Sequence, residues 1–142
     1  MSSLYIHIPF CKNKCFYCDF PSYSCMENSI EEYLNALEKE AKLRAKDTYD
    51  TIFIGGGTPT YLNEKQIEKL GNIISDINIA KDYEFTMEAN PGTLTKEKLS
   101  MMKDIGVNRL SMGLQSTNNE LLKSIGRIHK YEEFLKNYND AR

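Results

Sequence analysis

No apolar stretch in the chain approaches the roughly 20 consecutive residues that a membrane-spanning helix requires. The N-terminus also lacks the basic region and apolar core of a secretory signal. Neither a sequence repeat nor a low-complexity tract nor a Gly/Ser linker divides the chain. We therefore expect its 142 residues to form one domain in the cytoplasm, with no transmembrane segment.

A large excess of charge of one sign is also lacking. Charged residues make up 27% of the chain and hydrophobic residues 41%, and the net charge is -2. A nucleic-acid partner is normally signalled by a basic excess, so none is predicted. The composition is typical of a globular domain with a sizeable core.

Cysteine is scarce, but three of the four cysteines lie in one run, Cys11, Cys15 and Cys18. This CxxxCxxC triad directly follows a short apolar segment, residues 4–8. Three thiolates can bind three irons of a cubane iron-sulfur cluster, which leaves one iron with an open coordination position. We predict that a ligand other than protein binds and reacts at that iron.

Other interpretations of the triad remain open. His7 lies four residues before Cys11 and could complete a structural zinc site, although zinc sites usually have paired ligands at separated positions. The cysteines could also be free thiols. Two disulfides are a further alternative, but the lack of a signal peptide indicates a cytosolic protein, in which disulfides are rare.

Strand-like and helical segments alternate along the chain. The expected strands are residues 4–8, 51–55, 84–88 and 108–114. Helices are expected from Ser29 with a Ser29/Glu32 capping box, from Asn63, after Thr95, and from near Thr117 with a Thr117/Glu120 box. This alternation predicts an α/β fold with a parallel sheet.

The last two expected strands each have one polar face. In the third strand the apolar Phe85 and Met87 lie on one face and the polar Thr86 and Glu88 on the other. In the fourth strand one face has the apolar residues Leu110, Met112 and Leu114, and the other has Arg109, Ser111, Gly113 and Gln115. If the apolar face packs on helices, the polar face lines the interior and suits a polar ligand. An antiparallel sheet with one wet face is the alternative.

Three glycines follow the second expected strand in the segment Gly55-Gly-Gly-Thr-Pro-Thr60. Glycine lets the backbone approach a ligand closely, and active sites of α/β proteins form at the carboxyl ends of the strands. The segment is therefore a candidate ligand cradle, with a tight turn that binds nothing as the alternative.

The cysteine spacing, Tyr17 before the third cysteine and the glycine segment resemble the radical S-adenosylmethionine (SAM) superfamily. Further segments are similar to its coproporphyrinogen III oxidase-like branch, which includes oxygen-independent oxidases and the HemW haem chaperones. They are LYIHIPFC (4–11), CFYCDF (15–20), EANPG (88–92), NRLSMGLQS (108–116) and GRxH (126–129). The resemblance covers nearly the whole chain. It implies an α/β fold, a partial (β/α)6 TIM-like barrel of which this chain supplies about the first four βα units.

The resemblance also implies site residues. The metal ligands would be Cys11, Cys15 and Cys18, which would bind a 4Fe-4S cluster. The SAM contacts would be Tyr5, Tyr17, Gly56, Gly57, Thr58, Glu88, Gln115 and Arg127. No catalytic residue is assigned beyond the cluster. Without the family resemblance, Glu88 could simply cap a strand end and Arg127 could form a surface ion pair. We expect His7 and His129 to be packing or hydrogen-bonding residues and not ligands.

The chemistry implied is transfer of one electron from the cluster to the SAM sulfonium, which gives methionine and a 5′-deoxyadenosyl radical. The oxidases usually have a fourth cysteine two residues after the third, whereas Cys18 is followed here by Asp19 and Phe20, the chaperone-like form. Cys25 could replace that cysteine, but its separation from Cys18 favours a free thiol.

We therefore expect a protein similar to HemW, with haem and haem-accepting proteins as partners. An oxidase that decarboxylates coproporphyrinogen III in porphyrin biosynthesis is the alternative, and a structural zinc protein is a second one.

Members of this family run to several hundred residues, with a six-unit barrel and a C-terminal domain. The resemblance therefore implies that residues 1–142 are the N-terminal part of one radical SAM core domain, without the later barrel units, the C-terminal domain and its haem-binding region. A partial barrel leaves its fourth strand unpaired, so we expect this segment to associate or to be marginally stable.

Overall fold

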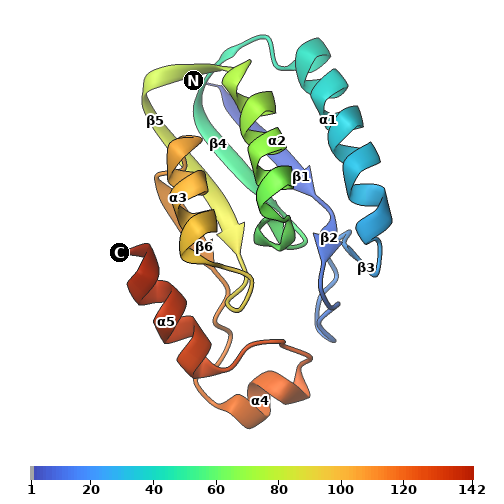
Figure 1. Cartoon of the computed structure of the whole chain (residues 1–142), viewed down its shortest axis with the longest axis vertical. Coiled ribbons are helices and arrows are strands. Elements are labelled where there is room, and N and C mark those ends of the chain that lie inside the picture. The colour runs from blue at the N-terminus through green and yellow to red at the C-terminus, as the bar shows by residue number, and fades with distance from the viewer. Residues whose placement is uncertain (1) are drawn as a thin grey trace.

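The structure, a computed structural model, describes residues 2–142 and is built around a four-stranded parallel sheet (Figure 1). The strand order is β1-β4-β5-β6, with bounds Ser3–Ile8, Thr48–Gly56, Asn78–Ala89 and Arg109–Met112. Helices α1 (Ile30–Arg44), α2 (Glu64–Ser75) and α3 (Lys96–Asp104) cover one face of this sheet. Parallel pairing confirms the predicted α/β class and rules out the antiparallel alternative.

Smaller elements lie around the carboxyl ends of the strands. Strands β2 (Phe10–Cys11) and β3 (Tyr23–Ser24) form a separate two-stranded sheet, and 3-10 turns span Glu27–Ser29 and Pro59–Tyr61. Helices α4 (Asn119–Ser124) and α5 (Tyr131–Ala141) follow β6. The helical pattern of α5 was not predicted.

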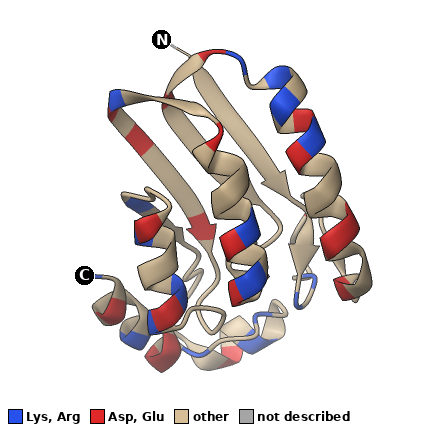
Figure 2. Cartoon of the chain, turned by 45° about the horizontal axis from the view of Figure 1, so that its top comes forward, with Lys and Arg blue, Asp and Glu red and all other residues tan. Residues whose placement is uncertain are grey.

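The core lies between the sheet and the three helices. Alternate residues of the strands, such as Ile6, Ile54 and Phe85, are fully or almost fully buried against Leu34 and Leu70 of the helices. Phe85 and Met87 of β5 pack into this core as their alternation predicted, and Thr86 on the opposite face is buried as well. Charged residues concentrate on the helices, and β1 has none (Figure 2).

The expected helix starts are confirmed at Ser29, Asn63 and Thr95, and α4 begins two residues after Thr117. Asn63 and Thr95 are N-caps, and their side chains accept hydrogen bonds from the backbone N–H groups of Gln66 and Lys98. The α2 start is a full capping box. Each cap satisfies a backbone donor that the first helical turn leaves unpaired.

Both predicted capping boxes are wrong. Ser29 has a helical backbone and its N–H donates to the Met26 carbonyl, because a 3-10 turn leads into α1, so its side chain caps nothing. In α4 the cap is Asn118, whose carboxamide accepts from two backbone N–H groups, rather than Thr117. Asparagine is also the better N-cap of these two residue types.

The strand bounds also differ from the expected ones. Strands β4 and β5 begin earlier than predicted, and β6 ends at Met112 instead of reaching residue 114. One edge of β6 has no neighbouring strand among residues 2–142, which matches the expected open fourth strand. None of the helices described is long and apolar enough to cross a membrane.

Candidate functional site

The cysteine triad lies on the loop that follows β1 and β2, at the carboxyl end of the parallel sheet. Cys11 is buried at the end of β2, where it pairs with Ser24 of β3, while Cys15 and Cys18 are partly exposed. All four cysteines are free, including the exposed Cys25, so the two-disulfide alternative is wrong. Three unpaired thiols on one loop are the donor set that a cubane cluster needs.

The loop is held in place by residues more than a hundred positions later. The backbone N–H of Phe16 donates to the Ile125 carbonyl at 3.1 Å, and the Asn13 carboxamide donates to the Gly126 carbonyl at 2.9 Å. Gly126 has a φ of 77°, and a side chain there would lie 3.5 Å from the Cα atom of Cys15. Glycine at this position therefore supplies the left-handed turn, while the distance to Cys15 is an ordinary packing contact.

Arg127 reaches from this turn to the cysteine loop. Its Nη1 lies 3.6 Å from Sγ of Cys15 and 3.3 Å from the Tyr17 hydroxyl. Its Nη2 donates to Asn90 Oδ1 and to the Gly113 carbonyl, both at 2.6 Å. No carboxylate within residues 2–142 forms an ion pair with Arg127, so the surface ion pair alternative is wrong.

The glycine segment packs directly against the start of the cysteine loop. The N–H groups of Gly57 and Thr58 donate to the carbonyls of Ile8 and Phe10, both at 2.8 Å. A Cβ atom on Gly57 would lie 2.6 Å from the Phe10 carbonyl oxygen and 3.0 Å from Sγ of Cys11. Only glycine lets the two segments approach this closely.

Glu88 joins the polar face of the sheet to the glycine segment. Its Oε2 accepts from the Gly56 N–H at 3.1 Å, and within residues 2–142 the other carboxylate oxygen has no hydrogen-bond partner. Tyr5 lies on the same polar face, stacked on Phe53. Partial burial and the nearby Glu88 charge raise the pKa of the Tyr5 phenol.

His7 is engaged elsewhere, as was expected of it. Its Nδ1 pairs with the Tyr5 hydroxyl at 3.0 Å and its Nε2 with the Pro21 carbonyl at 2.9 Å. Both ring nitrogens are thus occupied, which weighs against His7 as the fourth ligand of a zinc site. Within residues 2–142, no three His, Cys, Asp or Glu side chains lie close enough together to bind a single metal ion. A cubane cluster does not require this, because each cysteine binds a different iron atom.

Gln115 and His129 complete the predicted set. Gln115 has a left-handed backbone, with a φ of 69° that is uncommon for a residue with a side chain. A Cβ atom on Gly113 would lie 3.1 Å from Nε2 of Gln115 and 3.2 Å from Nη2 of Arg127, so the two side chains converge there. His129 is buried, and burial together with the Arg127 charge lowers its pKa.

These residues fit the implied cofactors. The triad offers three thiols for a cluster, the glycine segment lies against Cys11, and Nε of Arg127 is a buried donor that lacks an acceptor within residues 2–142. An unpaired cationic donor beside the cysteines suits an anionic group such as the carboxylate of an amino acid.

The comparison with known families decides the class. The model of the Radical SAM superfamily matches residues 5–142. This chain belongs to the radical SAM superfamily. The prediction made from the cysteine spacing is thereby confirmed.

Curated relatives narrow the similarity of this radical SAM chain. It is 48% identical to the heme chaperone HemW of Bacillus subtilis, over 100% of this chain and 39% of the relative. The HemW of Lactococcus lactis is 43% identical, over 90% of this chain and 34% of the relative. A solved structure of the radical SAM enzyme HemN, the coproporphyrinogen III oxidase of Escherichia coli, matches 99% of this chain and 34% of its own with a TM-score of 0.90 and 34% identity. The chain thus spans about a third to two fifths of the length of these proteins.

Two residues of this radical SAM site were not predicted. Asn90 accepts from Arg127, and its N–H donates to the Thr60 hydroxyl at 3.3 Å. Lys98 is buried, and its Nζ donates to the carbonyls of Thr60 and Thr93 at 2.9 and 3.2 Å. Asn90 thus connects the segment after the glycines to Arg127, and Lys98 connects the same segment to Thr93. A pattern search for ligands and glycines gives no signal for such supporting residues.

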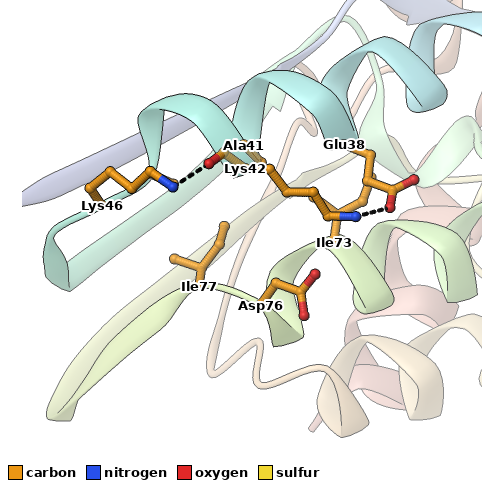
Figure 3. Close-up of a pocket in the computed structure, with 8 residues that line it drawn as sticks. Glu38, Ala41, Lys42, Lys46, Ile73, Asp76 and Ile77 are labelled. Carbon is orange, nitrogen blue, oxygen red and sulfur yellow. Dashed lines mark hydrogen bonds and ion pairs between the residues drawn. The ribbon is translucent and has the colours of Figure 1, made fainter.

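A separate hollow of about 140 Å³ lies between the C-terminal ends of α1 and α2 (Figure 3). Lys42 forms an ion pair with Glu38 at its rim, and Lys46 donates to the Lys42 carbonyl. It is lined partly by Ile73 and Ile77 and lies away from the cysteine loop. Nothing in its geometry connects it to the radical SAM site.

Proposed function

We propose that this chain binds a 4Fe-4S cluster and SAM in a protein that, like HemW, binds haem and delivers it to haem proteins. In this proposal Cys11, Cys15 and Cys18 hold the cluster. The observation that supports it most strongly is the arrangement of three free thiols beside a glycine segment and an arginine with an unpaired donor. When bound, the cluster supplies the electron that cleaves SAM.

The protein's own residues would bind and orient SAM. The close packing of Gly57 on Phe10 brings the glycine segment against the cysteine loop. Glu88 accepts from the Gly56 N–H through one carboxylate oxygen and would offer the other oxygen to an ammonium group. Arg127, fixed by two acceptors, would present Nε to a carboxylate. Tyr5, Tyr17, Thr58 and Gln115 would line the same space.

The chaperone reading rests on two observations. Curated proteins named HemW are up to 48% identical to this chain. The sequence also has Asp19 and Phe20 after the third cysteine, where the oxidases usually have a fourth one. By this proposal the partners are haem and the proteins that accept it, and the cytoplasm is the site of action.

A second candidate function is oxygen-independent coproporphyrinogen III oxidase. The observation that favours it is the fold match to HemN, which is a coproporphyrinogen III oxidase, with a TM-score of 0.90. The match covers 34% of the HemN structure, so it supports similarity in that part of the fold alone.

An anaerobic assay of the purified protein distinguishes these two functions. Haem is added to one sample and coproporphyrinogen III with SAM and a reductant to another, after the cluster has been reconstituted. Saturable haem absorbance with transfer to an apo-haem protein, without loss of carboxyl groups from the porphyrinogen, is the expected outcome. Conversion of the substrate to protoporphyrinogen would overturn the chaperone proposal.

A further inference from the structure

Two of the three cysteine sulfurs have a side-chain hydrogen-bond donor beside them. The Thr58 hydroxyl lies 3.5 Å from Sγ of Cys11, and Nη1 of Arg127 lies 3.6 Å from Sγ of Cys15. Both distances suit a hydrogen bond to sulfur. Within residues 2–142 no such donor lies beside Sγ of Cys18.

We infer that Thr58 and Arg127 set the reduction potential of the bound cluster by donating hydrogen bonds to two of its sulfur ligands. The inference rests on the proposed function, since it requires that a cluster binds to this triad. It gives these two residues a role that is independent of contact with SAM.

The Thr58 hydroxyl is buried and shielded from solvent. The residue is 5% exposed, Cys11 is buried as well, and the Thr58 N–H is fixed on the Phe10 carbonyl at 2.8 Å. A hydrogen bond is electrostatically stronger where the local dielectric is low. Because the backbone of Thr58 is held by the residue next to Cys11, its hydroxyl keeps its place against that sulfur.

Other contacts of the Arg127 guanidinium fix the orientation of Nη1. Nη2 is held by Asn90 Oδ1 and the Gly113 carbonyl, so the planar group presents Nη1 to the cysteine loop. No carboxylate within residues 2–142 competes for its charge. Asn90 is therefore a positioning residue for this donor.

The direction of the effect follows from charge. One-electron reduction adds negative charge to the cluster and its sulfurs, so a donor to a ligand sulfur stabilises the reduced state more than the oxidised one. Each donor therefore raises the potential and makes the cluster easier to reduce. Removal of one donor should lower the equilibrium constant for reduction about tenfold, which is about 59 mV for one electron.

The test is a redox titration of the reconstituted cluster without SAM, followed by its electron paramagnetic resonance (EPR) signal, with dithionite as the electron donor. Thr58→Val keeps the shape of the side chain and removes the hydroxyl, while Thr58→Ser keeps the hydroxyl. We expect Thr58→Val to titrate at a lower potential and Thr58→Ser to remain near the wild type. Equal potentials for Thr58→Val and the wild type would overturn the role of Thr58.

Arg127→Met provides an independent arm if Thr58→Val does not retain its cluster. Its control is Lys12→Met, which removes an exposed cation from the same loop without removing a donor to sulfur. We expect a lower potential for Arg127→Met and a much smaller change for Lys12→Met. Equal shifts in both variants would mean that general charge, and not the hydrogen bond, sets the potential, and would overturn the inference for Arg127.

The inference and the proposed function fail in different ways. If the wild type takes up no iron and sulfide, the proposed function fails together with the inference. If the cluster assembles and both Thr58→Val and Arg127→Met leave its potential unchanged, only the inference fails.

Discussion

Arg127 and Cys15 are 112 residues apart in the sequence, yet Nη1 of the arginine lies 3.6 Å from the cysteine sulfur. The contact closes one side of the site, because the turn that carries Arg127 also accepts backbone and side-chain hydrogen bonds from the cysteine loop. The loop therefore depends on residues from both ends of the chain. Each of the predictions below concerns a different part of this arrangement.

Replacing one cysteine of the triad should abolish the cluster. In Cys15→Ala one iron loses its protein ligand, so we expect little iron and sulfide after anaerobic reconstitution and loss of the visible absorbance. Cys25→Ala is the matched control, because Cys25 is free and exposed and lies outside the triad. Full absorbance in Cys15→Ala, or its loss in Cys25→Ala, would contradict the ligand assignment.

Gly57→Ala should disturb the site more than the fold. The new methyl group would meet the Phe10 carbonyl at 2.6 Å and Cys11 Sγ at 3.0 Å, and such overpacking costs roughly 1–3 kcal/mol. We expect weaker cluster retention, measured as iron per chain after desalting. Gly71→Ala in α2 is the control, because its methyl group would meet only the Ile105 side chain, so it should change stability and leave the iron content unaltered.

Glu88→Ala should weaken SAM binding. It removes the carboxylate that we propose accepts from the SAM ammonium group, and a hydrogen bond to a charged group is worth about 1.5–3 kcal/mol, so we expect the affinity to fall by about tenfold or more. Glu88→Gln keeps an oxygen acceptor and should lie between the two. Equilibrium dialysis of labelled SAM against the reconstituted protein measures this, and equal affinities for Glu88→Ala and the wild type would count against the role of Glu88.

His129 should make the folded state sensitive to mild acid. Burial and the Arg127 charge lower its pKa in the folded chain, whereas the unfolded chain titrates near about 6.5. As the pH falls below about 6.5 the unfolded state takes up the proton first, so the free energy of unfolding decreases toward the lowered pKa; above 6.5 this contribution is constant.

The measurement for His129 is the urea midpoint between pH 8 and pH 5 for the wild type and His129→Gln. Because the variant lacks the titrating ring, its midpoint should decline less on the acid side. Parallel pH profiles for the two proteins would show that His129 does not carry this dependence.

Local sequence patterns predicted the parts of the fold that depend on near neighbours. The alternation of β5 correctly gave the residues that pack into the core, and Asn63 and Thr95 correctly marked helix starts, because each depends on residues within a few positions. Ser29 and Thr117 fit the capping-box pattern, but neither side chain caps its helix, because a 3-10 turn leads into α1 and Asn118 caps α4.

The site also contains residues that local sequence patterns predicted and residues that they missed. The triad and the glycine segment were visible in the sequence because their chemistry depends on short spacings. Asn90 and Lys98 were not, since their importance comes from long-range contacts with Arg127 and Thr60 that no local pattern encodes. The converging arginine could be named beforehand only through the family resemblance.

The central claim is that the triad holds an iron-sulfur cluster with one iron open to SAM. The most direct measurement is iron, sulfide and zinc analysis of the anaerobically reconstituted protein, combined with EPR of the reduced cluster before and after SAM is added. We predict about four irons and four sulfides per chain, and an EPR signal that shifts when SAM binds. Zinc without sulfide, or a cluster whose signal SAM leaves unchanged, would contradict the account.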